Sequence, residues 1–60
     1  GRAEGEAKGR RDTLLRLIER RRIALTEEDR AKIADCGEVA TLERWCENVL
    51  DAKTIREVLK

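Results

Sequence analysis

The sequence predicts an all-α fold, in which one long N-terminal helix is followed by three short helices. The composition favours helix, because the chain has no proline and is rich in Ala, Leu, Glu, Arg and Lys. The β-branched residues are too scattered to form a strand of alternating pattern. Apolar residues instead recur at steps of three and four, which is the spacing of one helix face.

The segment 12–22 predicts the long helix through a broad apolar stripe: Leu14, Leu15, Leu17 and Ile18. Alanines at positions 3 and 7 continue the pattern backwards, so we expect residues 1–11 to be a Gly-, Ala- and charge-rich extension of this helix. Residues 12–60 then form a small helical domain. Gly1, Gly5 and Gly9 lie four apart in the extension. Each internal glycine costs about 1 kcal/mol relative to alanine, so we expect either close helix contact or a joint that frays easily.

A second helix is predicted to start at Thr26, because Asp29 stands three residues later in an approximate capping box. It runs to about Asp35, with Ile33, Ala34 and the aliphatic stem of Arg30 facing inward. Cys36 and Gly37 end it, and Gly37 is expected to supply a left-handed turn.

The third helix is predicted over residues 38–50, where one face carries Val39, Leu42, Cys46 and Val49, flanked by Trp45 and Leu50. A last start signal is Thr54 with Glu57 three residues later, a second capping box. It predicts a short terminal helix.

The two cysteines are the only soft metal ligands, and without a histidine they fall short of the four ligands that zinc takes. A zinc site shared between two chains is the alternative. We expect Cys46 to be a small core residue and Cys36 a turn residue, both reduced and free of metal. The sequence has neither a secretory signal nor a long apolar run, which predicts a cytoplasmic location and no membrane association.

No catalytic constellation is present. The chain has neither His nor Ser, so no Ser–His or Cys–His pair can form. Its many carboxylates stand at ordinary helix-surface spacings, as the pair Glu43 and Glu47 does. We therefore expect no enzymatic activity and no cofactor.

Size and charge together predict a partner chain. A chain this short buries only about 60 % of the surface that its unfolded form exposes. Residues 1–22 carry eight Lys/Arg and four Asp/Glu (+4), whereas residues 23–60 carry six and nine (−3). We expect a homo-oligomer, a dimer or larger, that buries an apolar set at the interface: Leu14, Leu15, Leu17, Ile18 and Trp45.

Six arginines support an alternative, a nucleic-acid-binding tail that contacts phosphates: Arg10, Arg11, Arg16, Arg20, Arg21 and Arg22. Asp12 and Glu19 interrupt this basic run, and no aromatic residue is interleaved. A net charge of +1 also gives little long-range attraction. We favour the interpretation that these arginines lie on a solvated face of the helix, or on a face that contacts the acidic segment of a neighbouring chain.

Five stretches occur in a defined order: "GEAKG" (Gly5–Gly9), "LLRLIERR" (Leu14–Arg21), "LTEEDRAKI" (Leu25–Ile33), "LERW" (Leu42–Trp45) and "VLDA…REVL" (Val49–Leu59). In order and spacing they resemble a C-terminal tail of bacterial Rpn-like recombination-promoting nucleases and putative transposases. The resemblance implies an accessory module attached to a PD-(D/E)XK nuclease domain, which would be its partner in cis. The catalytic residues of that domain have no counterpart in this sequence, and residues 22–24 depart from the Phe and Gly that are usual there.

Overall fold

The computed structural model describes residues 2–60, and the side chains from Glu4 onward. Four helices follow one another: α1 (Arg2–Arg20), α2 (Glu27–Asp35), α3 (Val39–Asp51) and α4 (Ile55–Val58). No strand occurs in this range, so the predicted all-α class is confirmed, with one long helix and three short ones. Gly1, the first of the spaced glycines, lies outside the described residues.

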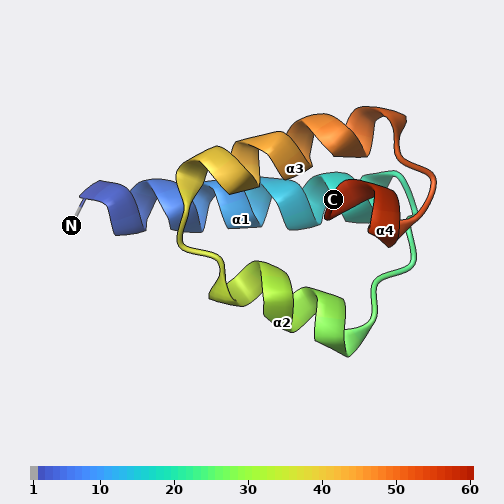
Figure 1. Ribbon diagram of the computed structural model, residues 1–60, viewed down its shortest axis with the longest axis horizontal. Coiled ribbons are helices and arrows are strands. Elements are labelled where there is room, and N and C mark those ends of the chain that lie inside the picture. Colours follow the sequence, from blue (N-terminus) through green and yellow to red (C-terminus); the bar gives the residue numbers. More distant parts are fainter. Residues whose placement is uncertain (1) are drawn as a thin grey trace.

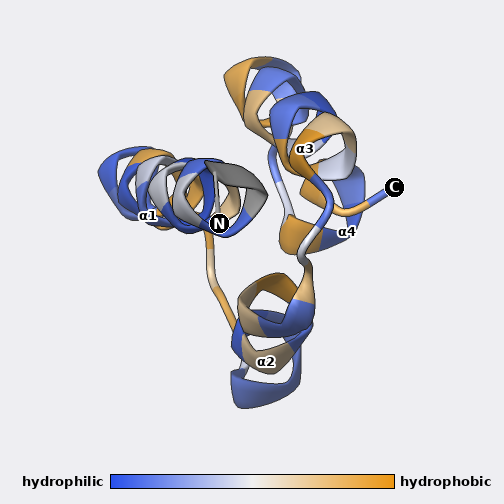
Figure 2. Ribbon diagram, turned by 90° about the vertical axis from the view of Figure 1, so that its left-hand side faces the viewer, coloured by the Kyte–Doolittle hydropathy of each residue, from blue (hydrophilic) through white to orange (hydrophobic). Residues whose placement is uncertain are grey.

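Helices α1 and α3 run in the same direction and pack along their length, as Figure 1 shows. Helix α2 runs back on another side of α1, and α4 folds back against α3. Seen end-on in Figure 2, α1, α2 and α3 surround a common centre, with α4 between α2 and α3. The radius of gyration is 10.6 Å, close to the value of about 10 Å expected for a folded domain of this length.

One core gathers apolar residues from all four helices and from the links between them: Ala7, Leu14, Ile18, Ile23, Ile33, Leu42, Trp45, Val49, Ala52 and Val58. Helix α2 contributes only Ile33, because it lies at the edge of the bundle. The expected inward orientation of Ala34 is wrong, since Ala34 is exposed, whereas Arg30, although exposed overall, borders the buried residues Ile18 and Ile23.

The N-terminal extension is part of α1, which runs unbroken from Arg2 to Arg20 and confirms the predicted backward continuation. Ala7 ties the extension to the core, with 2 % of its surface exposed. Gly5 and Gly9 are exposed, and a Cβ added at either would meet nothing within 4 Å. Within one chain these two glycines therefore make no close contact with another helix.

Helix α1 ends in a Schellman motif whose left-handed residue is an arginine. Arg22 has a φ of 56°, and its N–H donates to the Glu19 carbonyl at 3.0 Å. The N–H of Ile23 donates to the Ile18 carbonyl at 3.1 Å, and both isoleucine side chains are buried. This pairing is the Schellman pattern together with its usual apolar contact. Burial of Ile23 offsets the cost of placing a residue with a side chain in the left-handed region.

The left-handed turn predicted at Gly37 is wrong, because no described glycine has a positive φ. Helix α2 ends instead at Cys36, whose backbone is extended and whose N–H donates to the Ile33 carbonyl at 3.2 Å. Figure 1 shows the chain crossing directly from α2 to α3 at this point. An extended link suffices for that crossing.

The two predicted capping boxes have different outcomes. Thr26 caps α2, because its Oγ1 accepts a hydrogen bond from the Asp29 N–H at 3.1 Å and donates one to the Asp29 carboxylate at 2.8 Å. Thr54 precedes α4, but its side chain makes no capping hydrogen bond. The Glu57 carboxylate accepts from the Lys53 N–H at 3.4 Å instead. The start of α4 is thus where the sequence predicts it, and the predicted side-chain cap is wrong.

Candidate interaction surface

Two of the six arginines proposed as phosphate contacts bind the ends of other helices. The Arg11 guanidinium donates to the Cys36 carbonyl at 2.7 Å. That of Arg21 donates to the carbonyls of Leu50 and Ala52 at 2.6 and 3.3 Å. The last carbonyls of a helix lack intrahelical partners and lie at the negative end of its dipole, which attracts cations. These two arginines therefore connect α1 to the C-terminal ends of α2 and α3.

The other four arginines lie at the surface. Arg10 pairs with Glu43 at 3.1 Å, where each side chain is 51 % exposed. Arg16, Arg20 and Arg22 are exposed, and none of them forms an ion pair within residues 4–60. Only these three offer an unengaged guanidinium, so the set that could contact phosphates is half the size that the sequence predicts.

The five apolar residues proposed at a self-association surface divide between core and edge. Leu14, Ile18 and Trp45 are at most 5 % exposed and pack against the chain's own helices. Leu15 and Leu17 are partly buried at the edge of that core. The three short helices thus cover more of α1 than the sequence suggests, because α3 lies along it. Of the five, only Leu15 and Leu17 remain accessible to a second chain.

Leu15 borders a hollow of about 320 Å³ between α1, the following link and α2, lined by Leu15, Ile18, Glu19, Ile23, Leu25 and Arg30. Ile18 and Ile23 are buried, whereas the two charged residues are exposed, so the hollow has an apolar floor and a charged edge. We call it the α1–α2 hollow. It could accept one apolar side chain of a partner.

A second apolar surface lies where α1 and α3 meet, and we call it the seam: Leu17, Cys46 and Leu50. Leu50 is 62 % exposed and is the one large apolar side chain so exposed among the described residues. Leu17 and Cys46 are partly buried. Figure 2 shows hydrophobic ribbon on the outer edge of α3, away from α2.

Helical spacing places these three side chains on the facing sides of the two helices. Leu17 lies seven residues after Arg10 and four before Arg21, both of which contact α3. Residues seven and four apart share one side of a helix. On α3, Leu50 lies seven residues after Glu43, the partner of Arg10, so it faces the same way.

The predicted self-association set omits Leu50. The signal for it is present in the sequence, because Leu50 stands one position beyond Val49 and so lies off the buried stripe of α3. A leucine in such a position points sideways from an amphipathic helix. Whether that side is covered depends on the neighbouring helix, which local spacing does not reveal.

The cysteines are free thiols in separate surroundings. Cys36 caps α2, and the Cys46 sulfur lies 4.0 Å from the Arg10 carbonyl. Burial raises the pKa of the Cys46 thiol, the charge of Arg10 partly offsets that rise, and Glu43 adds to it. A raised pKa leaves less thiolate, the form that attacks and binds metal. Residues 4–60 contain no group of three or more His, Cys, Asp or Glu side chains that could hold a metal ion.

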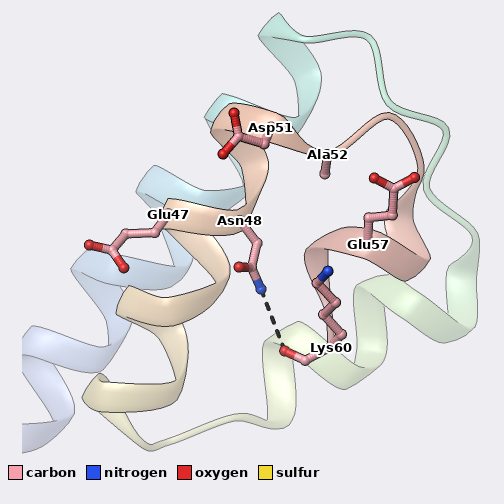
Figure 3. Close-up of a pocket in the computed structure, with 6 residues that line it drawn as sticks. All are labelled: Glu47, Asn48, Asp51, Ala52, Glu57 and Lys60. Carbon is pink, nitrogen blue, oxygen red and sulfur yellow. Dashed lines mark hydrogen bonds between the residues drawn. The ribbon is translucent and has the colours of Figure 1, made fainter.

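A polar hollow lies at the corner of α3 and α4, and Figure 3 shows its lining: Glu47, Asn48, Asp51, Ala52, Glu57 and Lys60. The Asn48 amide donates to the Val58 carbonyl at 2.9 Å and to the Lys60 carbonyl at 3.4 Å, so it fastens the end of α4 to α3. The three carboxylates point in different directions.

The chain matches no family model, no curated protein and no solved structure. The resemblance to the tail of Rpn-like nucleases therefore remains a hypothesis that depends on the five stretches alone. Within residues 2–60, no helix is both long enough and apolar enough to cross a bilayer.

Proposed function

We propose that this chain is a non-enzymatic helical interaction module that associates with further copies of itself. The seam is the observation that supports this function most. A single exposed leucine is ordinary on a protein surface. Leu50, however, continues a partly buried apolar strip between two packed helices, on a chain of which 45 % of the residues are charged. A further pair of helices can extend such an edge into a larger bundle.

The distribution of charge supports a partner of the same sequence. The outer side of α1 exposes Arg16 and Arg20, whereas the first turn of α2 exposes Glu27 and Glu28 and the outer side of α3 exposes Glu47. A net charge of +1 gives little overall repulsion between copies. Opposite charges on different faces can then pair between copies, with a modest strength that salt reduces.

The parent that we propose is a cytoplasmic, nuclease- or transposase-like bacterial protein, of which this chain is the C-terminal accessory domain. The order and spacing of the five stretches support this assignment. Self-association of such a tail would pair or cluster the parent's nuclease domains.

A nucleic-acid-binding tail is the second candidate, and the exposure of Arg16, Arg20 and Arg22 favours it. Three phosphate contacts would release about three counterions. The logarithm of the binding constant would then fall with the logarithm of salt concentration with a slope of about −2.7. That slope is shallow, and the corresponding binding is weak.

Sedimentation equilibrium from micromolar to millimolar concentration tests the proposal. We expect the average mass to rise from the 6.9 kDa of the monomer to at least twice that value. The association should survive high salt, because apolar contact contributes most of it. A labelled DNA duplex is titrated with the same samples. A chain that stays monomeric throughout and binds the duplex with the slope of about −2.7 expected for three phosphate contacts would replace the proposal with the second candidate.

A further inference from the structure

The seam also defines a geometry for self-association, and this step rests on the proposed function. We propose that two copies dock seam to seam about a two-fold axis that runs across both helices, so that α1 and α3 of one copy lie antiparallel to α1 and α3 of the other. Arg20 of each copy then lies at the level of Glu47 of the other, diagonally across the contact. The partner is a second copy of this chain, and the contact uses the same surface twice.

The register of α1 against α3 is fixed by three contacts. Arg10 pairs with Glu43 at 3.1 Å, and the Arg10 carbonyl lies 4.0 Å from the Cys46 sulfur. Further along, Arg21 reaches the Leu50 carbonyl at 2.6 Å. The paired residues are 33, 36 and 29 positions apart, so, since the helices run in the same direction, each level of α1 corresponds on average to a residue about 33 positions later on α3. This register sets Leu17 and Leu50 at the same level, side by side in the middle of the seam.

Two exposed charges flank that level at opposite ends. Arg20 follows Leu17 by three residues on α1, about one turn toward the C-terminal end. Glu47 precedes Leu50 by three residues on α3, about one turn toward the N-terminal end. The seam is therefore apolar in the middle, acidic on α3 at one end and basic on α1 at the other.

A two-fold axis that runs across the seam, along the line from Leu17 to Leu50, relates the two copies. Rotation about it lays α1 of the second copy over α1 of the first and α3 over α3, each with its direction reversed. Arg20 of the second copy then lies at the level of Glu47 of the first, and the converse pair forms by symmetry. An isologous contact thus pairs both charges twice, with the four leucine side chains between them.

The remaining charges beside the seam are already engaged within the chain. Arg10 and Glu43 pair with each other, and Arg21 binds two carbonyls. Arg20 and Glu47 are exposed and form no ion pair within residues 4–60. They are therefore the two charges at the seam that are available to a partner, and they have opposite signs.

The α1–α2 hollow is the competing surface for a second copy. Its edge carries Glu19 and Arg30, which lie on different helices across the hollow. Nothing in its charge pattern selects a partner of the same sequence. Association through this hollow is therefore one of the outcomes that the experiment below can distinguish.

Charge exchange tests the proposal directly. Arg20→Glu and Glu47→Arg should each weaken the homodimer about tenfold or more, because each variant places two pairs of like charges in the contact. An equimolar mixture of the two variants should restore a heterodimer of wild-type affinity, since each Arg–Glu pair is then complete. Lys32→Glu and Glu28→Arg on α2 change the net charge by the same amounts and should leave the dissociation constant within about twofold.

Leu50→Asp separates failure of this geometry from failure of the proposed function. Leu50 is 62 % exposed, so the variant should keep wild-type helicity and be monomeric at concentrations where the wild type is dimeric. A wild type that associates, together with unaffected Leu50→Asp and no rescue on mixing, overturns the seam while self-association stands. Loss of association in Leu25→Asp alone, with helicity retained, assigns it to the α1–α2 hollow. A wild type that is monomeric at millimolar concentration overturns both proposals.

Discussion

Along α1, the arginines that face the other helices are engaged by the chain itself, whereas those on the opposite side are exposed to solvent. Arg11 and Arg21 bind carbonyls at the ends of α2 and α3. Arg16 and Arg20 are exposed and form no ion pair within residues 4–60. The same residue type therefore stabilises the fold on one side of a helix and remains available for a partner on the other. A run of arginines in a sequence does not by itself indicate a phosphate-binding face.

The largest difference between the two sides should appear at a pair of neighbours, Leu14 and Thr13. Leu14 is fully buried, so Leu14→Ala should lower the free energy of unfolding by about 3 kcal/mol through lost burial and a cavity. Thr13 is exposed, and Thr13→Ala should leave the free energy within about 0.5 kcal/mol or raise it slightly. Urea denaturation measures both. Equal losses at the two positions would contradict the assigned inner side of α1.

Two arginine variants sharpen the comparison, because each of them removes one positive charge. Arg11→Ala should cost about 1.5 kcal/mol, because it removes a charged hydrogen bond to the partly buried Cys36 carbonyl. Arg16→Ala, which removes the same charge from the outer side, should cost less than about 0.5 kcal/mol. The difference between the two variants should persist at high salt, which weakens only the general effect of charge. A difference that vanishes with salt would mean that Arg11 acts only through its net charge.

Two threonines extend the comparison from helix sides to helix starts. Thr26→Ala should cost about 1 kcal/mol, because its side chain caps α2. Thr54→Ala should cost only a few tenths of a kcal/mol, since Thr54 makes no capping hydrogen bond. Thermal melts of both variants beside the wild type measure this contrast. Similar losses for both would show that Thr54 caps α4 in solution.

In the last comparison, we expect a gain in stability on the outer side of α1. Gly9→Ala should raise the free energy of unfolding by about 0.7 kcal/mol, because alanine favours helix and its Cβ meets no neighbour within 4 Å. Ala7→Gly, two positions away on the buried side, should lower stability by at least that amount. A loss on Gly9→Ala at concentrations where the chain is monomeric would contradict the exposed placement of Gly9.

The sequence predicts much of this fold because its local signals are strong. Apolar residues at helical spacing and the Thr26 cap place three helices within a few residues of their observed bounds. One feature escapes prediction because it depends on how the chain packs after α1. The left-handed residue is Arg22 and not Gly37, since burial of Ile23 in the core beside Ile18 favours the Schellman turn.

The candidate surface was less predictable than the helices. The two arginines bind carbonyls that lie 25 to 31 positions away in the chain, which no local pattern indicates. Burial of Leu14, Ile18 and Trp45 within a single chain follows from the parallel packing of α3 on α1. Helical spacing alone shows which residues share a side, and tertiary packing decides which side is covered.

The most direct test of the central claim is the concentration dependence of the amide chemical shifts of the ¹⁵N-labelled chain. The seam geometry predicts that shifts move with concentration from micromolar to millimolar, and that they cluster at Leu17, Arg20, Glu47 and Leu50. The amides of Leu25 and Arg30, which border the α1–α2 hollow and lie outside α1, should stay fixed. Spectra that do not change over this range, or changes confined to the hollow, would contradict the account.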